Sequence, residues 1–115
     1  MKLYNWNEVA EEELNPRIRR KMFHTATMTV SRLRLLRGVL VPTHSHSNEQ
    51  ISSVEEGALR FVTPTGEVVV KAGESLCIPP NLPHSVESLE DCVVVDIFSP
   101  VREDWVRGDD AYLRG

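Results

Sequence analysis

The chain has 115 residues, of which 41% are hydrophobic, and a formal net charge of −4. This length and composition predict one globular domain with its own core, and they exclude a largely disordered chain. The acidic total disfavours binding to a nucleic-acid backbone. The first residues contain no apolar run long enough for a signal peptide or a membrane span. We therefore expect a cytoplasmic protein that binds neither nucleic acid nor a membrane.

Short apolar segments separated by turn residues follow one another along most of the chain. Residues 8–13 are acidic with only a weak helical signal, whereas many later segments have the composition of strands. Strands are expected at residues 18–25, 27–36, 51–55, 59–63, 68–70, 76–78, 84–88 and 92–98. Because no long amphipathic helix interrupts them, the sequence predicts an all-β sandwich or barrel. Residues 1–115 are expected to form this single domain, with a core at about 18–100, a short N-terminal arm and a C-terminal tail.

Three further features have ordinary structural interpretations. Residues 17–21 hold the densest basic cluster, which a solvated strand edge explains better than a nucleic-acid site. Cys77 and Cys92 lie in separate apolar segments, which favours buried reduced thiols over a disulfide. His24 has no neighbouring ligand-type residue, so we expect it at the surface or at a strand edge.

The other three of the four histidines are arranged in a way that favours a metal site. Side chains alternate in an extended strand, so His44 and His46 share a face, and Gln50 joins them if the extension continues. His84 follows the rigid, proline-rich residues 79–83. Three imidazoles and one amide oxygen suit a divalent transition metal, one of Ni, Zn, Fe, Mn or Cu. The alternative is a set of unrelated surface histidines.

Asp96 is the one charged residue in the most apolar predicted strand, residues 92–98. By alternation it shares a face with Val94 and Phe98, so its carboxylate is expected to be at least partly buried. A buried carboxylate either pairs with a cation or has a raised pKa, and the second case makes it a candidate proton donor or acceptor. The alternative is a structural ion pair, for which the candidate partners are Arg32, Arg34 and Arg102.

Other residues near Asp96 in the sequence suggest a substrate. Arg102 offers a planar fork that suits a carboxylate, although it is equally consistent with a surface charge beyond the last strand. Phe98 is either an apolar wall beside a sugar ring or part of the core. Trp105 and Tyr112 are expected to pack against the barrel or against a second subunit. The neutral Gln50 amide leaves the full divalent charge on a metal, which favours Lewis-acid chemistry over dioxygenase chemistry.

The spacing of these residues resembles the two cupin motifs. The first motif is matched by Gly38, His44, His46, Gln50 and Gly57, with glutamine where many cupins have glutamate. Gly73, Pro79 and His84 match the second, with Asn81 and Ser88 in place of the more usual glycine and asparagine. The resemblance covers roughly residues 30–100. It implies a cupin double-stranded β-helix, a jelly-roll barrel with the metal inside.

Three stretches of the chain resemble the pectin-degradation cupins of the KdgF type: residues 96–104, the His-Ser-His…Gln-Ile-Ser run and the Ile-Pro-Pro-Asn…Pro-His run. That family opens the ring of 4,5-unsaturated uronate monosaccharides to give the linear 5-keto-4-deoxyuronate, in the breakdown of pectin or alginate. The resemblance implies metal ligands at His44, His46, Gln50 and His84, and substrate or reaction contacts at Asp96, Phe98 and Arg102.

The resemblance therefore predicts a metal-dependent isomerase or lyase whose substrate is a sugar acid. We also expect a homodimer, because the strand edges of the charged N-terminal third need covering and small cupins similar to this chain commonly pair. Two alternatives remain open at this point. One is a cupin dioxygenase that uses iron(II), and the other is a cupin that binds a sugar or metabolite without converting it.

Overall fold

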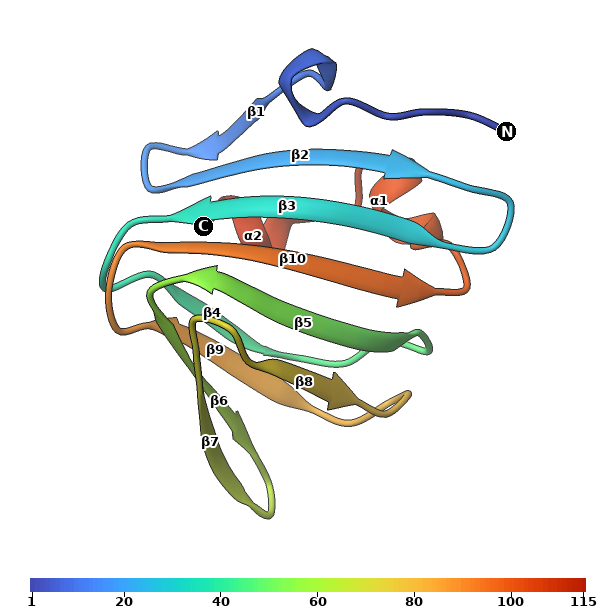
Figure 1. The fold of residues 1–115 in the computed structure, drawn as a ribbon. Coiled ribbons are helices and arrows are strands. Elements are labelled where there is room, and N and C mark those ends of the chain that lie inside the picture. The colour runs from blue at the N-terminus through green and yellow to red at the C-terminus, as the bar shows by residue number, and fades with distance from the viewer.

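The computed structural model describes residues 1–115 as two antiparallel β-sheets packed against each other, with short helices near both ends of the chain (Figure 1). The elements are a 3-10 helix at Trp6–Glu8, strands β1 (Glu12–Asn15), β2 (Ile18–His24), β3 (Thr29–Leu35), β4 (Leu40–His44), β5 (Glu49–Glu56), β6 (Ala58–Thr63), β7 (Gly66–Lys71), β8 (Ser75–Ile78), β9 (His84–Ser88) and β10 (Cys92–Ser99), and helices α1 (Glu103–Val106) and α2 (Ala111–Arg114). The predicted all-β architecture is confirmed.

The larger sheet has the strand order β1-β2-β3-β10-β5-β8 and the smaller sheet β4-β9-β6-β7. Strand β10 lies between β3 and β5, where its alternating pattern buries every second side chain against the core. Val94, Asp96 and Phe98 all belong to this buried face, as the alternation predicted. The buried apolar side chains of the two sheets form a single cluster. The centre of the larger sheet therefore carries a carboxylate into the interior.

The C-terminal helices cover a part of the larger sheet. In Figure 1, α1 and α2 lie behind β2, β3 and β10. Trp105 of α1 and Leu113 of α2 are buried and join the same core cluster as Leu14 and Leu33. The tail thus packs against the barrel, one of the two arrangements expected for it. Neither helix approaches the length and apolar character that crossing a membrane requires.

Two predictions about exposure are wrong. Arg20, from the basic cluster, is only 1% exposed, because its guanidinium pairs with Asp110 at 2.8 Å and lies 4.6 Å from the ring centroid of Trp105. Its partner is 90 residues away in the sequence, so the local pattern shows only a group of cations. Cys77 is exposed on the edge strand β8, whereas Cys92 is buried as expected, and both thiols are free.

The two departures from the second cupin motif have a physical explanation. Asn81 has φ = +65°, a left-handed conformation that asparagine tolerates better than most residues, and its N–H donates to the His46 carbonyl at 2.8 Å. The buried Ser88 hydroxyl accepts from the Val39 N–H at 2.8 Å and donates to the Leu36 carbonyl at 2.6 Å. Both residues fix loops that lead to the histidines.

Candidate functional site

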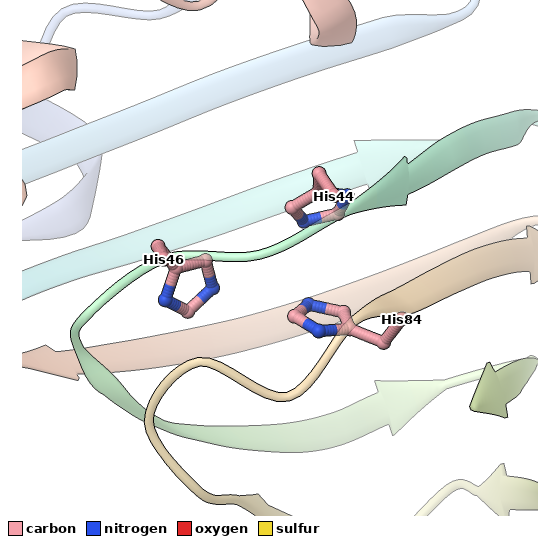
Figure 2. Close-up of side chains that lie close together, drawn as sticks. All are labelled: His44, His46 and His84. Atoms are coloured by element: carbon pink, nitrogen blue, oxygen red, sulfur yellow. The ribbon is translucent and has the colours of Figure 1, made fainter. Parts of the chain in front are cut away.

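Three histidine side chains converge between the ends of β4 and β9 (Figure 2). His44 is the last residue of β4 and lies opposite His84, the first residue of β9, in the register of these two strands. His46 follows in the loop after β4. One ring nitrogen from each histidine lies within 4.8 Å of the others. These three residues therefore form a group that can hold a metal ion.

Each imidazole is held by its own stretch of backbone. The Nδ1 atoms lie against carbonyl oxygens two residues away, for His44 at Pro42 (2.8 Å), for His46 at Asn48 (3.1 Å) and for His84 at Leu82 (2.8 Å). A carbonyl oxygen only accepts, so each Nδ1 carries the proton and each Nε2 keeps a lone pair. The Nε2 atom of His84 is buried without any hydrogen-bond partner. An orphaned lone pair beside two further imidazoles fits a divalent transition ion.

Gln50 completes this donor set from the opposite sheet. Its Oε1 lies 3.0 Å from Nε2 of His46, and its amide orientation is fixed because its Nε2 donates to the Ser52 hydroxyl at 2.9 Å. Burial, followed by the nearby Arg102 and His84, lowers the pKa of His46 to about 4, so the imidazole is neutral at physiological pH. Two acceptor atoms then face each other with no proton between them. A shared cation satisfies both lone pairs.

Gln50 reaches the histidines by a route that the alternation did not predict. The extended chain ends at His44, and residues 45–48 cross from the smaller sheet to β5 of the larger one. Asn48 fixes this crossing, because its buried side chain donates to the carbonyls of Pro100 (2.5 Å) and Val101 (3.3 Å). The four expected side chains therefore meet because the loop folds back, and not because one strand continues through them.

Asp96 is buried beside this group and makes no ion pair. Its Oδ1 accepts from the Ser52 hydroxyl at 2.5 Å and from the Gln50 amide at 3.4 Å, while Oδ2 has no hydrogen-bond partner. Burial outweighs these hydrogen bonds and raises the pKa of Asp96 to about 6. The ion-pair alternative is wrong, because its three candidate partners are engaged elsewhere: Arg32 with Glu55, Arg34 with Glu11 and Arg102 with Asp104.

Arg102 is buried as well, which rules out its interpretation as a surface charge. Its Nε and Nη2 donate to the Asp104 carboxylate at 3.0 and 2.8 Å, and Nη2 also donates to the Tyr112 hydroxyl at 2.6 Å. The guanidinium lies 4.7 Å from the Phe98 ring centroid and 4.4 Å from that of Trp105. Burial lowers its pKa, but the bonds to Asp104 and Tyr112 outweigh this effect and the pKa is raised. Nη1 alone has no hydrogen-bond partner in the protein.

A cavity of about 50 Å³ joins the metal-type ligands to these polar groups. Its polar lining is made by His44, Gln50, Ser52, His84, Asp96, Arg102 and Tyr112, and its aromatic walls by Phe61, Phe98 and Trp105. Phe98 is thus both a core residue and a wall of the cavity. His24 is not part of this group: it is half-buried at the end of β2, with Nδ1 2.8 Å from the Thr29 hydroxyl.

Four polar residues that hold the site together were not recognised in the sequence: Asn48, Ser52, Asp104 and Tyr112. Ser52 could have been found, since it has the same parity as Gln50 along β5 and both side chains are buried. Asp104 and Tyr112 bond to Arg102 through the short helices of the tail. No local periodicity marks that arrangement.

The comparisons with known proteins agree with this geometry. A family model described as a cupin domain matches residues 32–98. No curated protein matches the sequence. Among solved structures, KdgF from Halomonas sp. is similar with 27% identity and a TM-score of 0.82, covering 90% of this chain and 99% of that one. An RmlC-like cupin from Shewanella frigidimarina has 24% identity and a TM-score of 0.83, covering 91% and 96%.

Oxalate decarboxylase is a more distant neighbour. It has 17% identity to this chain and a TM-score of 0.74, covering 84% of this chain and 29% of its own length. This similarity concerns the fold alone. The family match spans more than half of the sequence and contains all three clustered histidines. The chain therefore belongs to the cupin family and has a KdgF-like structure.

Proposed function

We propose that this protein is an enzyme that opens the ring of 4,5-unsaturated uronate monosaccharides and gives the linear 5-keto-4-deoxyuronate. One observation carries the proposal: a buried carboxylate with a free oxygen and a buried arginine with a free nitrogen face the same small cavity as His44 and His84 of the three-histidine group. The resemblance of residues 96–104 to the KdgF-type cupins supports it, as does the similarity to the KdgF structure.

One divalent transition ion would be held by His44, His46, Gln50 and His84. It would supply Lewis-acid polarisation of substrate oxygens. The residues fit such an ion because three Nε2 atoms and one amide oxygen are all left with lone pairs that no protein donor uses. The neutral amide adds no negative charge to the donor set.

Asp96 would carry the proton. With a pKa of about 6 it is mostly ionised near neutral pH, yet it reprotonates easily, which is the range that general acid–base catalysis requires. Its Oδ2 would accept the proton of the anomeric hydroxyl while the bond between the ring oxygen and the anomeric carbon breaks. The aldehyde and an enolate result, with the electrons of the broken bond on the former ring oxygen. Return of the proton from Asp96 to C4 then converts the enolate into the ketone, so the reaction is a balanced isomerisation.

Arg102 and Phe98 would hold the sugar acid. The guanidinium is fixed on two sides by Asp104 and Tyr112, so Nη1 can donate to a substrate carboxylate without reorganising. The Phe98 ring lies 4.7 Å from the guanidinium and would form an apolar wall of the cavity beside the sugar ring. Together these groups would place the anomeric end of the substrate near Asp96.

The direct experiment is to incubate the metal-loaded protein with 4,5-unsaturated galacturonate and follow the enol-ether absorbance. We expect the absorbance to fall without oxygen consumption and to remain constant after chelation of the metal. Loss of absorbance that requires oxygen would instead identify a dioxygenase. Binding of the sugar acid by calorimetry with constant absorbance would identify a binding protein and overturn the proposal.

A further inference from the structure

The hydroxyl of Tyr112, on α2, accepts two hydrogen bonds and does not donate its own proton to any atom of the protein. Its oxygen lies 2.6 Å from Nη2 of Arg102 and 3.0 Å from Nε1 of Trp105. Arginine and tryptophan nitrogens are donors only, so the tyrosine oxygen accepts both bonds. The proton of the hydroxyl therefore remains available, and no acceptor of the protein takes it.

This free donor lies beside a second one. Nη1 of Arg102 also has no partner, and Arg102 and Tyr112 both line the cavity that contains His44 and Asp96. The Tyr112 ring lies 4.7 Å from the His44 ring, centroid to centroid. The cavity has a volume of about 50 Å³, so it is small. A larger molecule that enters it must contact Tyr112 or displace it.

We propose that Tyr112 is a substrate-binding and specificity-determining residue, which donates its hydroxyl proton to an oxygen of the carboxylate that Arg102 binds through Nη1. The inference rests on the proposed function, since that function supplies a carboxylate in this cavity. Two neighbouring donors favour a carboxylate over a neutral sugar, because hydrogen bonds from the guanidinium Nη1 and the tyrosine hydroxyl are stronger to a charged acceptor than to a neutral hydroxyl.

The test compares Tyr112→Phe with the wild type and with Tyr4→Phe. Tyr112→Phe keeps the ring over His44 and removes the hydroxyl. Tyr4 stacks on Phe23, away from the cavity, and makes no hydrogen bond through its hydroxyl, so Tyr4→Phe is a matched control. The readouts are KM and kcat for unsaturated galacturonate, and the dissociation constants of saturated galacturonate and neutral galactose by calorimetry, all with metal-loaded protein.

For Tyr112→Phe we expect KM and the dissociation constant of galacturonate to rise about tenfold, the effect of losing one hydrogen bond to a charged group. The change in kcat should be much smaller, the weak binding of galactose should not change, and Tyr4→Phe should behave as the wild type. Unchanged galacturonate binding by Tyr112→Phe would overturn the inference, as would an equal loss for galactose.

The two proposals fail in different ways. If the wild type binds galacturonate but converts no unsaturated uronate, the proposed function is wrong, and the binding comparison still decides the role of Tyr112. If the wild type converts the substrate and Tyr112→Phe does so with the same KM, only the role of Tyr112 is wrong. A lowered melting temperature with unchanged KM would mean that the hydroxyl is merely structural.

Discussion

The Ser52 hydroxyl donates to Oδ1 of Asp96 at 2.5 Å, and the Ser52 oxygen accepts a hydrogen bond from the Gln50 amide at 2.9 Å. Ser52 is therefore a direct link between a candidate metal ligand and the candidate proton carrier. The chain Gln50–Ser52–Asp96 fixes which end of the amide faces the histidines and which carboxylate oxygen is left free. A change at Gln50 or Ser52 should disturb both the metal-type ligand and the proton carrier, whereas a change at Asp96 should affect proton transfer alone.

Asp96→Asn tests the proton carrier. The amide keeps the size of the carboxyl group and accepts from Ser52, but it cannot cycle a proton, so we expect turnover to fall about 10²–10⁴-fold with the metal content unchanged. Because Asp96 makes no ion pair, the melting temperature at neutral pH should not fall. A progress curve and a thermal melt on one preparation give both answers. Near-normal turnover would assign Asp96 another role.

Ser52→Ala tests how Asp96 is tuned. The Ser52 hydrogen bond lowers the pKa of Asp96 against the larger effect of burial. Its loss should raise that pKa by about one unit, and the acid limb of the pH profile of kcat/KM should move to higher pH by the same amount. The matched control is Ser53→Ala, since Ser53 bonds to Ser75 on the outer side. An equal shift in both variants would contradict the prediction.

His84→Ala tests the metal site. Wild-type protein purified without chelator should contain one transition-metal ion per chain by elemental analysis. Loss of the His84 imidazole should weaken binding by at least about 100-fold, because even indirect supports of a metal site are worth 10–100-fold. Gln50→Ala should weaken it less. His24→Ala is the control and should keep its metal, since His24 lies three strands away from Gln50 in the larger sheet and is not part of the three-histidine group. Equal metal content in all variants would refute the assignment.

The stability of the metal-free protein should depend on pH in a defined direction. Burial lowers the folded-state pKa of His44, His46 and His84 below the usual 6.5, so the unfolded chain binds more protons below that pH and stability rises with pH up to about 6.5. Asp96 acts oppositely between 3.8 and about 6, because its folded-state pKa is raised. Asp96 therefore offsets part of the combined contribution of the three imidazoles, because three groups act in one direction and one in the other.

The melting temperature of the metal-free wild type should therefore rise between about pH 4 and pH 6.5. Asp96→Asn removes the opposing contribution of the carboxylate. The free energy of unfolding should therefore increase over this pH interval by up to about 3 kcal/mol more in the variant than in the wild type. Calorimetric melts in a series of buffers at constant ionic strength measure both slopes. A melting temperature that falls as the pH rises through this range would contradict the assignment of neutral, buried imidazoles.

We further expect the homodimer that the sequence suggested. On the outer side of the larger sheet, Ile97, Ile51 and Cys77 are cross-strand neighbours, and Ile51 is 40% exposed. Sedimentation equilibrium should give twice the chain mass of 13.0 kDa. Ile51→Glu should give the monomer, whereas Val62→Glu, at an equally exposed site on the smaller sheet, should not. A single 13.0 kDa species for the wild type would refute the expectation.

Most strands could be predicted because their apolar residues alternate or cluster locally. Strands β1 and β4 could not. β1 contains two glutamates and buries only Leu14, while β4 contains Pro42 and only one buried residue, Val41. Their positions are set by pairing with β2 and β9. Edge strands of this kind are stabilised by their neighbours more than by their own composition.

The metal-type ligands and Asp96 could be predicted from residue type and spacing, because polar side chains in apolar strands are conspicuous. The environment of Arg102 could not. Its partners Asp104 and Tyr112 depend on how two four-residue helices fold back over the sheet, and helices this short carry no periodic signal. For the same reason, the burial of Arg20 against Asp110 was not visible in a cluster of basic residues.

The two parts of the site come from different stretches of chain. The clustered histidines lie within residues 44–84 on the barrel, whereas Arg102 and Tyr112 follow the last strand. Metal coordination and substrate selection thus depend on separate stretches of chain. A protein engineer can therefore vary residues after β10 without replacing any metal-type ligand. A library confined to Asp104 and Tyr112, selected on different sugar acids, would vary the groups around Arg102 while leaving the core residues of the tail and the metal-type ligands unchanged.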